Sequence, residues 1–193
     1  FVLFIKLSAY GANIEQVEVE SRYLTNPVKV TVISPSSGSA TDGQLIPTLY
    51  LLNGFDGDHN SWLQMAPNLS SLSDQYSIRV ICPDGKNSWY WDSSKQKNMN
   101  YESFFIKELI PHLTEIYGLP SEREWTAITG FSMGGHGAFW LATQYPDKFG
   151  AVGSISGGLD LRAFKTNWNL QELLGSYKEN EKNKKQKLLI KKD

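Results

Sequence analysis

Cysteine is nearly absent from this chain, which has one cysteine, Cys82, among its 193 residues. A single thiol excludes an intrachain disulfide and any cysteine-rich metal site. The sequence also lacks an apolar run of roughly 18 residues, the length that a membrane-spanning helix requires. Neither sign of charge is in excess, because the chain has 19 Lys and Arg residues and 20 Asp and Glu residues. This balance argues against a general nucleic-acid-binding protein.

What the sequence does contain is a globular composition, with 40% hydrophobic and 12% aromatic residues. Residues 1–12 are apolar and end in small residues, as the last part of a secretory signal peptide does, although an N-terminal strand also fits. The remaining length suits one domain. We therefore expect a single domain over residues 13–193 in a secreted or periplasmic protein.

Short runs of valine and other apolar residues predict the strands of a sheet. Valines alternate with polar residues at 17–19 and 28–32, and the turn between them at 25–27 predicts an antiparallel hairpin. Later runs are mostly apolar, as in parallel strands that are covered on both faces. These runs lie at residues 48–52, 78–82, 126–129 and 151–155.

Helical patterns separate the apolar runs, over residues 62–72, 101–117 and 133–145. Pro111 is expected to kink or divide the second of these helices. The alternation of strands and helices predicts an α/β fold with a doubly wound, mostly parallel sheet and an N-terminal antiparallel hairpin.

One motif carries chemistry, the sequence Gly-Phe-Ser-Met-Gly at residues 130–134. It follows a predicted strand and precedes a predicted helix, which is the context of a nucleophile elbow. In such an elbow a sharp turn exposes the hydroxyl of Ser132, and Gly130 and Gly134 leave room for the turn. The N-terminus of the helix offers free N–H groups to a developing oxyanion. Ser132 is therefore the candidate nucleophile.

A serine nucleophile of this kind needs N–H donors for the oxyanion of its intermediate. The first expected donor is the backbone N–H of Met133, the residue after the serine. The second should come from the loop after an earlier strand, and the sequence Leu-Leu-Asn-Gly-Phe at residues 51–55 is that loop. We predict the backbone N–H of Phe55 as the second donor.

Four segments in order make the chain resemble the putative-esterase family of α/β-hydrolases. They are residues 50–62 with Leu-Leu-Asn-Gly, residues 80–92 with Pro-Asp-Gly and Ser-Trp-Tyr, the elbow, and residues 145–158 with Tyr-Pro-Asp-Lys-Phe and Ser-Gly-Gly. The family includes tributyrin and feruloyl esterases, S-formylglutathione hydrolases and mycolyltransferases. The likeness is greatest to the tributyrin and feruloyl branch, and it implies an α/β-hydrolase fold. Asn53 is a departure, since the family usually has His there, but a backbone donor at Phe55 should tolerate the change.

The base that activates Ser132 is not evident in the sequence. α/β-Hydrolases carry the triad acid and then the histidine after the serine, but the last histidine of this chain is His136. Its position down the elbow helix directs it away from the serine hydroxyl, so we expect a structural histidine. His59 and His112 precede Ser132. The resemblance implies that the acid and base lie beyond an apolar strand at 187–190.

Two explanations fit the missing triad partners. The chain is part of a larger enzyme, or it is a naturally truncated and inactive form. The first is favoured, because a strand at 187–190 with nothing after it leaves an unfinished sheet edge, which is an aggregation hazard. Asp193 follows that strand, but it is terminal and we assign it no role. In either case we expect a fold that is incomplete at its C-terminus and nearly inactive by itself.

Trp89 is the predicted substrate contact. It follows a predicted strand end in the sequence Trp-Tyr-Trp at residues 89–91, where it either packs in the core or forms a wall for the acyl group. Cys82 lies within a predicted strand and is expected to be a small buried apolar residue.

A calcium-loop pattern begins at Asp56, Asp58 and Asn60 but does not continue. Its sixth position is Ser61 rather than Gly, and its twelfth is Pro67 rather than Glu. We therefore expect neither a metal nor another cofactor.

Together these features predict a carboxylic-ester hydrolase that works through a serine acyl-enzyme. Its expected substrates are short-chain acyl esters or acetyl and feruloyl esters on polysaccharide. Acyl transfer to a sugar and S-formylglutathione hydrolysis remain open as enzymatic alternatives. A truncated, non-catalytic protein that binds an ester or a carbohydrate remains open as another class.

Overall fold

The computed structural model describes residues 11–36, 45–161 and 168–175 of the chain. Most of the expected signal segment therefore lies outside the described residues. The expected strand at 187–190 and Asp193 lie outside them as well.

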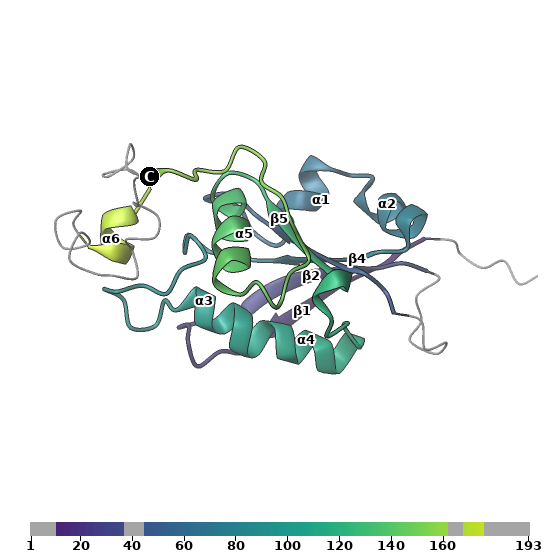
Figure 1. The fold of residues 1–193 in the computed structure, drawn as a ribbon, viewed down its shortest axis with the longest axis horizontal. Coiled ribbons are helices and arrows are strands. Elements are labelled where there is room, and N and C mark those ends of the chain that lie inside the picture. The colour runs from purple at the N-terminus through teal and green to yellow at the C-terminus, as the bar shows by residue number, and fades with distance from the viewer. Residues whose placement is uncertain (1–10, 37–44, 162–167, 176–193) are drawn as a thin grey trace, which may run out of the picture.

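A six-stranded mixed sheet forms the centre of the fold (Figure 1). Its strands are β1 (Asn13–Val19), β2 (Val28–Ser34), β3 (Thr48–Leu52), β4 (Arg79–Pro83), β5 (Thr126–Gly130) and β6 (Ala151–Val152). Their order across the sheet is β1-β2-β4-β3-β5-β6. The β1–β2 and β2–β4 pairs are antiparallel, and the three other pairs are parallel. The predicted hairpin and the predicted mostly parallel sheet are both confirmed.

Helices follow the strands in the predicted alternation. They are α1 (Ser61–Met65), α2 (Leu69–Tyr76), α3 (Tyr101–Phe104), α4 (Ile110–Tyr117), α5 (Met133–Gln144) and α6 (Leu170–Leu174), with a π-helical segment at Phe105–Leu109 and a 3₁₀ turn at Arg123–Trp125. In Figure 1, α3 and α4 lie on one side of the sheet, and α1 and α2 lie on the other.

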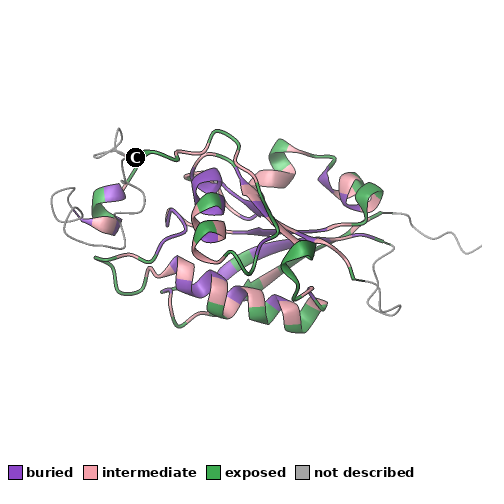
Figure 2. Cartoon of the chain, viewed as in Figure 1, coloured by how far each residue is buried: buried purple, intermediate pink, exposed green. Residues whose placement is uncertain are grey.

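Both faces of the sheet are covered, because neighbouring strand residues point alternately into two hydrophobic clusters. Leu52 and Ile81 belong to the larger cluster, together with residues of α3, α4 and α5. Leu51 and Val80 belong to the smaller cluster, which Leu69 of α2 completes. Buried residues accordingly run along the strands (Figure 2). This double cover explains why β3 and β4 are mostly apolar.

Prolines accompany irregularities in two of the predicted helices. The helix expected over 62–72 is two helices, because α1 ends at Met65 and Pro67 lies in the break. The helix expected over 101–117 contains the π-helical segment, after which Pro111 lies in the first turn of α4. Proline has no N–H to donate and is tolerated in a first turn. The backbone stays helical from α3 through α4, so Pro111 does not divide this helix, and a kink there stays a prediction. The single helix over 62–72 was wrong.

The strand expected over 151–155 is shorter than predicted. It covers two residues, Ala151 and Val152, and a bridge between Phe131 and Ile155 continues the pairing with the β5 segment. Val152 and Ile155 are 42% and 50% exposed. The outer side of the sheet at β6 is thus the least covered part of the parallel region.

Candidate active site

Ser132 lies in a sharp turn between β5 and α5, the position that the sequence predicts. Its backbone has φ 52° and ψ −115°, a left-handed conformation that is costly for a residue with a side chain. Three backbone hydrogen bonds hold the turn: Ser132 N–H to Ile155 O, Gly134 N–H to Phe131 O, and His136 N–H to Ser132 O. Ser132 itself is only half-buried. Ser132 thus lies at a strained strand–helix junction, with part of its surface exposed to solvent.

The two glycines of the motif are required by close backbone contacts. A Cβ atom on Gly134 would lie 2.2 Å from the carbonyl oxygen of Leu52, and a Cβ atom on Gly130 would lie 2.4 Å from backbone atoms of Gly134. Neither approach is sterically possible, because real Cβ contacts are longer than 3.0 Å. The elbow helix can therefore start directly beside the end of β3 only with glycine at both positions.

The predicted oxyanion loop lies against the nucleophile. A Cβ atom on Gly54 would be 3.5 Å from the Cβ atom of Ser132, so the backbone before Phe55 passes beside the serine. Within the described ranges, the N–H of Phe55 donates no hydrogen bond. Met133 is the first residue of α5, so its N–H has no acceptor within the helix. Neither N–H thus has a hydrogen-bond acceptor among the described residues, and their role as oxyanion donors stays a prediction.

Strained backbone gathers in the loops that follow the parallel strands. Six residues with side chains have positive φ there, namely Asp56, Lys86, Trp89, Tyr90, Ser132 and Ser156. They follow β3, β4, β5 and β6. Ligands of open α/β sheets bind at the carboxyl ends of the strands, and backbone strain of this kind concentrates at functional sites.

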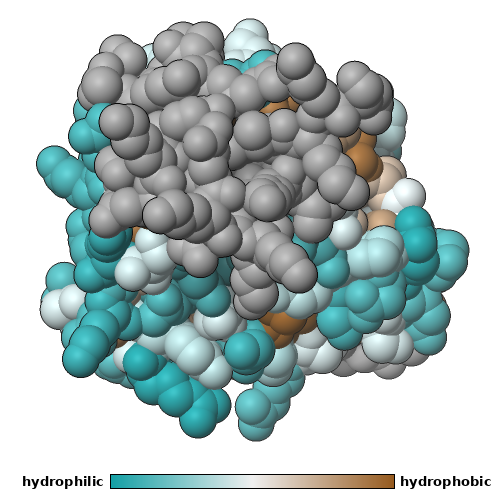
Figure 3. All heavy atoms as spheres, turned by 60° about the vertical axis from the view of Figure 1, so that its left-hand side comes forward, coloured by the Kyte–Doolittle hydropathy of each residue, from teal (hydrophilic) through white to brown (hydrophobic). Residues whose placement is uncertain are grey.

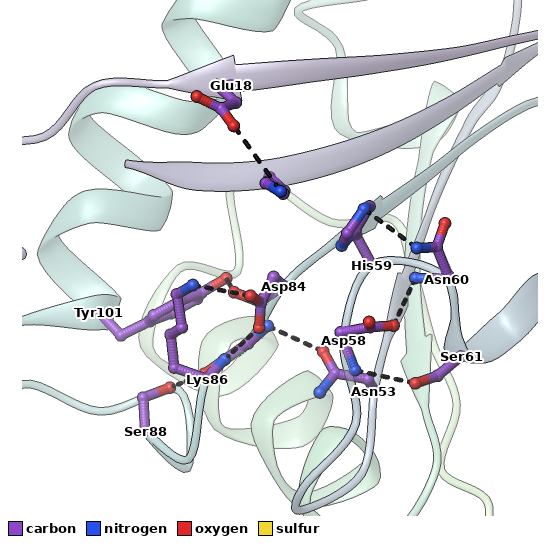
Figure 4. Close-up of polar contacts among 12 residues, drawn as sticks. Glu18, Asn53, Asp58, His59, Asn60, Ser61, Asp84, Lys86, Ser88 and Tyr101 are labelled. Atoms are coloured by element: carbon purple, nitrogen blue, oxygen red, sulfur yellow. Dashed lines mark hydrogen bonds and ion pairs between the residues drawn. The ribbon is translucent and has the colours of Figure 1, made fainter. Parts of the chain in front are cut away.

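Asn53, the departure from the family pattern, is completely buried and hydrogen-bonded. Its side-chain oxygen accepts from the N–H of Gly85 at 2.8 Å, and its side-chain nitrogen donates to Gly54 O at 2.9 Å. Figure 4 shows Asn53 reaching toward the turn that contains Asp84 and Lys86. An amide at this position therefore links the loop after β3 to the loop after β4.

The structure describes all three histidines, and no histidine side chain forms a hydrogen bond with Ser132. His136 Nδ1 lies 2.9 Å from the carbonyl oxygen of Gly158, so Nδ1 carries the proton. Burial lowers the pKa of His136 to about 4 and outweighs the opposing hydrogen bond to Gly158. His59 contacts the side chain of Asn60 (Figure 4), and His112 is exposed on α4. The geometry of His136 fits the expected structural histidine.

Trp89 is buried in an aromatic cluster and is 3% exposed. Its ring lies 6.3 Å from that of Trp91, 5.5 Å from that of His136 and 5.9 Å from that of Trp168, measured between ring centroids. Packing against these rings explains why Trp89 is buried. Its role as a substrate contact stays a prediction. The sequence pattern favours Trp89 over its neighbour Tyr90, although it is Tyr90 that contacts the predicted oxyanion loop, at Asn53. Adjacent aromatic residues give no sequence cue that separates these roles.

Cys82 is buried as expected, and burial raises the pKa of its thiol to about 12. Across the described ranges, no group of three or more His, Cys, Asp or Glu side chains is arranged to hold a metal ion. Two carboxylates of the incomplete calcium-loop pattern are hydrogen-bonded within the protein. Asp56 accepts a hydrogen bond from the side chain of Asn87, and Asp58 accepts one from the backbone N–H of Asn60. Among all the described residues, no helix is both long and apolar enough to cross a membrane. The face in Figure 3 is largely hydrophilic where its residues are described, with small hydrophobic areas between them.

Comparison with known proteins gives one family and several relatives. A model of the family described as Putative esterase matches residues 21–192. An acetyl esterase of Caldicellulosiruptor saccharolyticus is 35% identical over 118 residues, which are 61% of this chain and 44% of that protein. The diacylglycerol acyltransferase/mycolyltransferase Ag85B of Mycobacterium avium is 31% identical over 160 residues, which are 78% of this chain and 46% of that protein. The chain thus spans less than half the length of these two relatives.

Solved structures agree with the fold. A ferulic acid esterase that is 24% identical superposes with a TM-score of 0.70, covering 78% of this chain and 61% of that chain. The structural neighbours are α/β-hydrolase esterases, so the predicted α/β-hydrolase fold is confirmed.

Proposed function

The chain belongs to the putative-esterase family, and on this premise we propose that it acts as a carboxylic-ester hydrolase with Ser132 as the nucleophile. The observation that carries the proposal is the elbow itself. A half-buried serine stands in a strained turn at φ 52°, with the loop before Phe55 against it. Strain of about 1–3 kcal/mol at one residue persists only when the surrounding contacts enforce it.

The proposed reaction proceeds through an acyl-enzyme. The Ser132 oxygen attacks the ester carbonyl carbon, and the N–H groups of Phe55 and Met133 donate hydrogen bonds to the oxyanion that forms. The bond to the alcohol oxygen then breaks, and the alcohol leaves with the proton that serine has given up. Water attacks the acyl-serine and releases the carboxylic acid. We assign the general base and its carboxylate to no residue of this chain.

Acetyl and other short-chain acyl esters are the substrates that we propose first. The relative named acetyl esterase supports them, and the resemblance to feruloyl esterases extends the proposal to acyl groups on polysaccharide. A second candidate is acyl transfer to a sugar hydroxyl instead of water, which the relative named mycolyltransferase supports. The product separates the two, because added glucose should yield an acyl sugar only in the second case.

Hydrolysis of p-nitrophenyl acetate tests the nucleophile. Because the chain should be nearly inactive by itself, we expect a low protein-dependent rate that added imidazole raises and that Ser132→Ala abolishes. Ser71→Ala, which changes an exposed serine on α2, should leave the rate unchanged. Because no histidine side chain forms a hydrogen bond with Ser132, the rates are measured with and without added imidazole as a diffusible base. Imidazole alone also cleaves the ester, and the Ser132→Ala protein supplies that background. Equal rates for the parent and Ser132→Ala under both conditions would refute catalysis by Ser132 and favour a non-catalytic binding protein.

A further inference from the structure

Tyr90 is a buried tyrosine whose hydroxyl contacts the oxyanion loop. It has no exposed surface, and its oxygen lies 3.1 Å from the backbone oxygen of Asn53 and 3.1 Å from the side-chain oxygen of the same residue. The amide orientation of Asn53 follows from its other partners, since its oxygen accepts from Gly85 N–H and its nitrogen donates to Gly54 O. Both atoms facing Tyr90 are therefore acceptors, and the phenol donates to them. Burial raises the pKa of Tyr90 well above its usual value, so the donor proton is retained.

Asn53 in turn fixes the peptide that carries the N–H of Phe55. Its side-chain nitrogen donates to the carbonyl oxygen of Gly54 at 2.9 Å, and the N–H of Gly57 donates to the same oxygen at 3.1 Å. The Gly54 carbonyl and the Phe55 N–H belong to one planar trans peptide and point in opposite directions. Holding the carbonyl therefore sets the direction of the N–H.

The ring of Tyr90 is fitted against the elbow helix. A Cβ atom on Gly137 of α5 would lie 2.2 Å from a ring carbon of Tyr90, and one on Gly85 would lie 2.2 Å from its hydroxyl oxygen. Tyr90 itself has φ 60°, a conformation that costs energy for an aromatic residue. One rigid side chain therefore touches the helix that begins after Ser132 and the residue that orients the oxyanion loop.

We propose that Tyr90 is a positioning residue for the oxyanion hole: through Asn53 it holds the Phe55 N–H at a fixed place relative to the elbow helix. This inference rests on the proposed function, because an oxyanion hole requires the serine reaction. Tyr90 touches no reacting atom, so it acts on the transition state only through the N–H that it orients. Its removal should affect the turnover number rather than ground-state binding.

Tyr90→Phe tests the hydroxyl without emptying the core. We expect kcat for p-nitrophenyl acetate to fall about tenfold, with KM within about twofold, since a displaced oxyanion donor weakens only the transition state. Asn53→Ala should lower kcat as well. The kcat of the double variant should be no lower than that of the less active single variant, because both changes break the same contact between Tyr90 and Asn53.

Tyr101→Phe is the matched control. Tyr101 is equally buried, packs against Tyr90 with ring centroids 5.3 Å apart, and donates its hydroxyl to a backbone oxygen, that of Asp84 at 2.8 Å (Figure 4). Its hydroxyl has no contact with Asn53 among the described hydrogen bonds. We expect this variant to keep kcat within about twofold of the parent.

Amide NMR gives a readout that does not depend on turnover. In Tyr90→Phe, the Gly85 N–H should exchange with solvent about fivefold faster and the Phe55 amide signal should shift, whereas Tyr101→Phe should leave both unchanged. The inference is overturned if Tyr90→Phe keeps the parent's kcat and amide signals, or if the control loses as much as Tyr90→Phe. If the amide changes occur as expected while the parent and Ser132→Ala hydrolyse the ester equally, the positioning contact stands and the esterase function fails.

Discussion

Ser132 combines an unfavourable backbone conformation with contacts that enforce it. Its φ of 52° is maintained by hydrogen bonds to Ile155 and His136 and by the glycines on either side. A hydroxyl held in this way needs no reorganisation before it reacts, which is the general advantage of a preorganised nucleophile. The contacts that enforce the turn come from β3, from Ile155 in the segment after β6, and from α5. The position of one residue thus depends on three parts of the fold.

His136 makes the stability of the fold depend on pH. Burial lowers its pKa to about 4 in the folded protein, below the ordinary value of 6.5 that the unfolded chain should have. The unfolded state therefore binds a proton first as the pH falls. The stability that neutral His136 provides is complete above pH 6.5 and is lost between about pH 6.5 and pH 4.

The expected size of this effect is about 2 kcal/mol of unfolding free energy lost between pH 7 and pH 5. Urea denaturation at both values measures it. Carboxylates also titrate over this range, so the diagnostic quantity is the difference between the parent and His136→Gln. The variant should lose about 2 kcal/mol less than the parent, and an equal pH dependence would show that His136 is not buried in neutral form.

At the scale of single residues, the sequence identified those whose chemistry or shape is distinctive. Ser132 and its two glycines were identifiable because the motif needs those residue types at that spacing. The link from Tyr90 through Asn53 was not identifiable, because it joins residues 37 positions apart and depends on the direction of a side-chain amide. Trp89, Tyr90 and Trp91 look alike in sequence, and only their packing gives them different contacts.

At the scale of elements, the elbow depends on how closely α5 approaches β3. Gly134→Ala places a methyl group 2.2 Å from the Leu52 carbonyl oxygen, and backbone on both sides prevents an easy adjustment. We expect it to lower the unfolding free energy by about 3 kcal/mol and to lower ester hydrolysis, because α5 must shift away from the oxyanion loop.

Gly11→Ala provides the control for the glycine change, since a Cβ atom there meets nothing within 4 Å. Its effect should stay within about 0.5 kcal/mol, as measured by urea denaturation of both variants. Similar losses from the two substitutions would contradict the close packing of α5 on β3.

The boundaries of helices and strands were predictable where a local sequence pattern determines them. The strands were predictable because their alternation or apolar runs reflect cover on one or both faces. The break at Pro67 was missed because the apolar pattern over 62–72 continues across it. The π-helical segment at Phe105–Leu109 was not predicted either, because five residues are too few to show a change in the spacing of apolar residues.

At the scale of the whole molecule, the predicted α/β-hydrolase fold is confirmed, but the sequence did not specify the strand order. β4 lies between β2 and β3, a crossover that depends on tertiary packing rather than on local pattern. This order brings the loops after β3, β4 and β5 to one edge of the sheet. Ser132, the loop before Phe55 and Tyr90 therefore meet, although they lie far apart in the chain.

Covalent labelling shows whether Ser132 is a preorganised nucleophile. A fluorophosphonate reacts with an activated serine by losing fluoride, and its phosphoryl oxygen occupies the oxyanion position. Cleavage after Arg123 and Lys148 releases a peptide in which Ser132 is the only serine. Mass spectrometry should find the adduct on this peptide in the native protein and not in Ser132→Ala. An adduct spread over other serines, or one that forms equally fast on the urea-unfolded chain, would contradict the account.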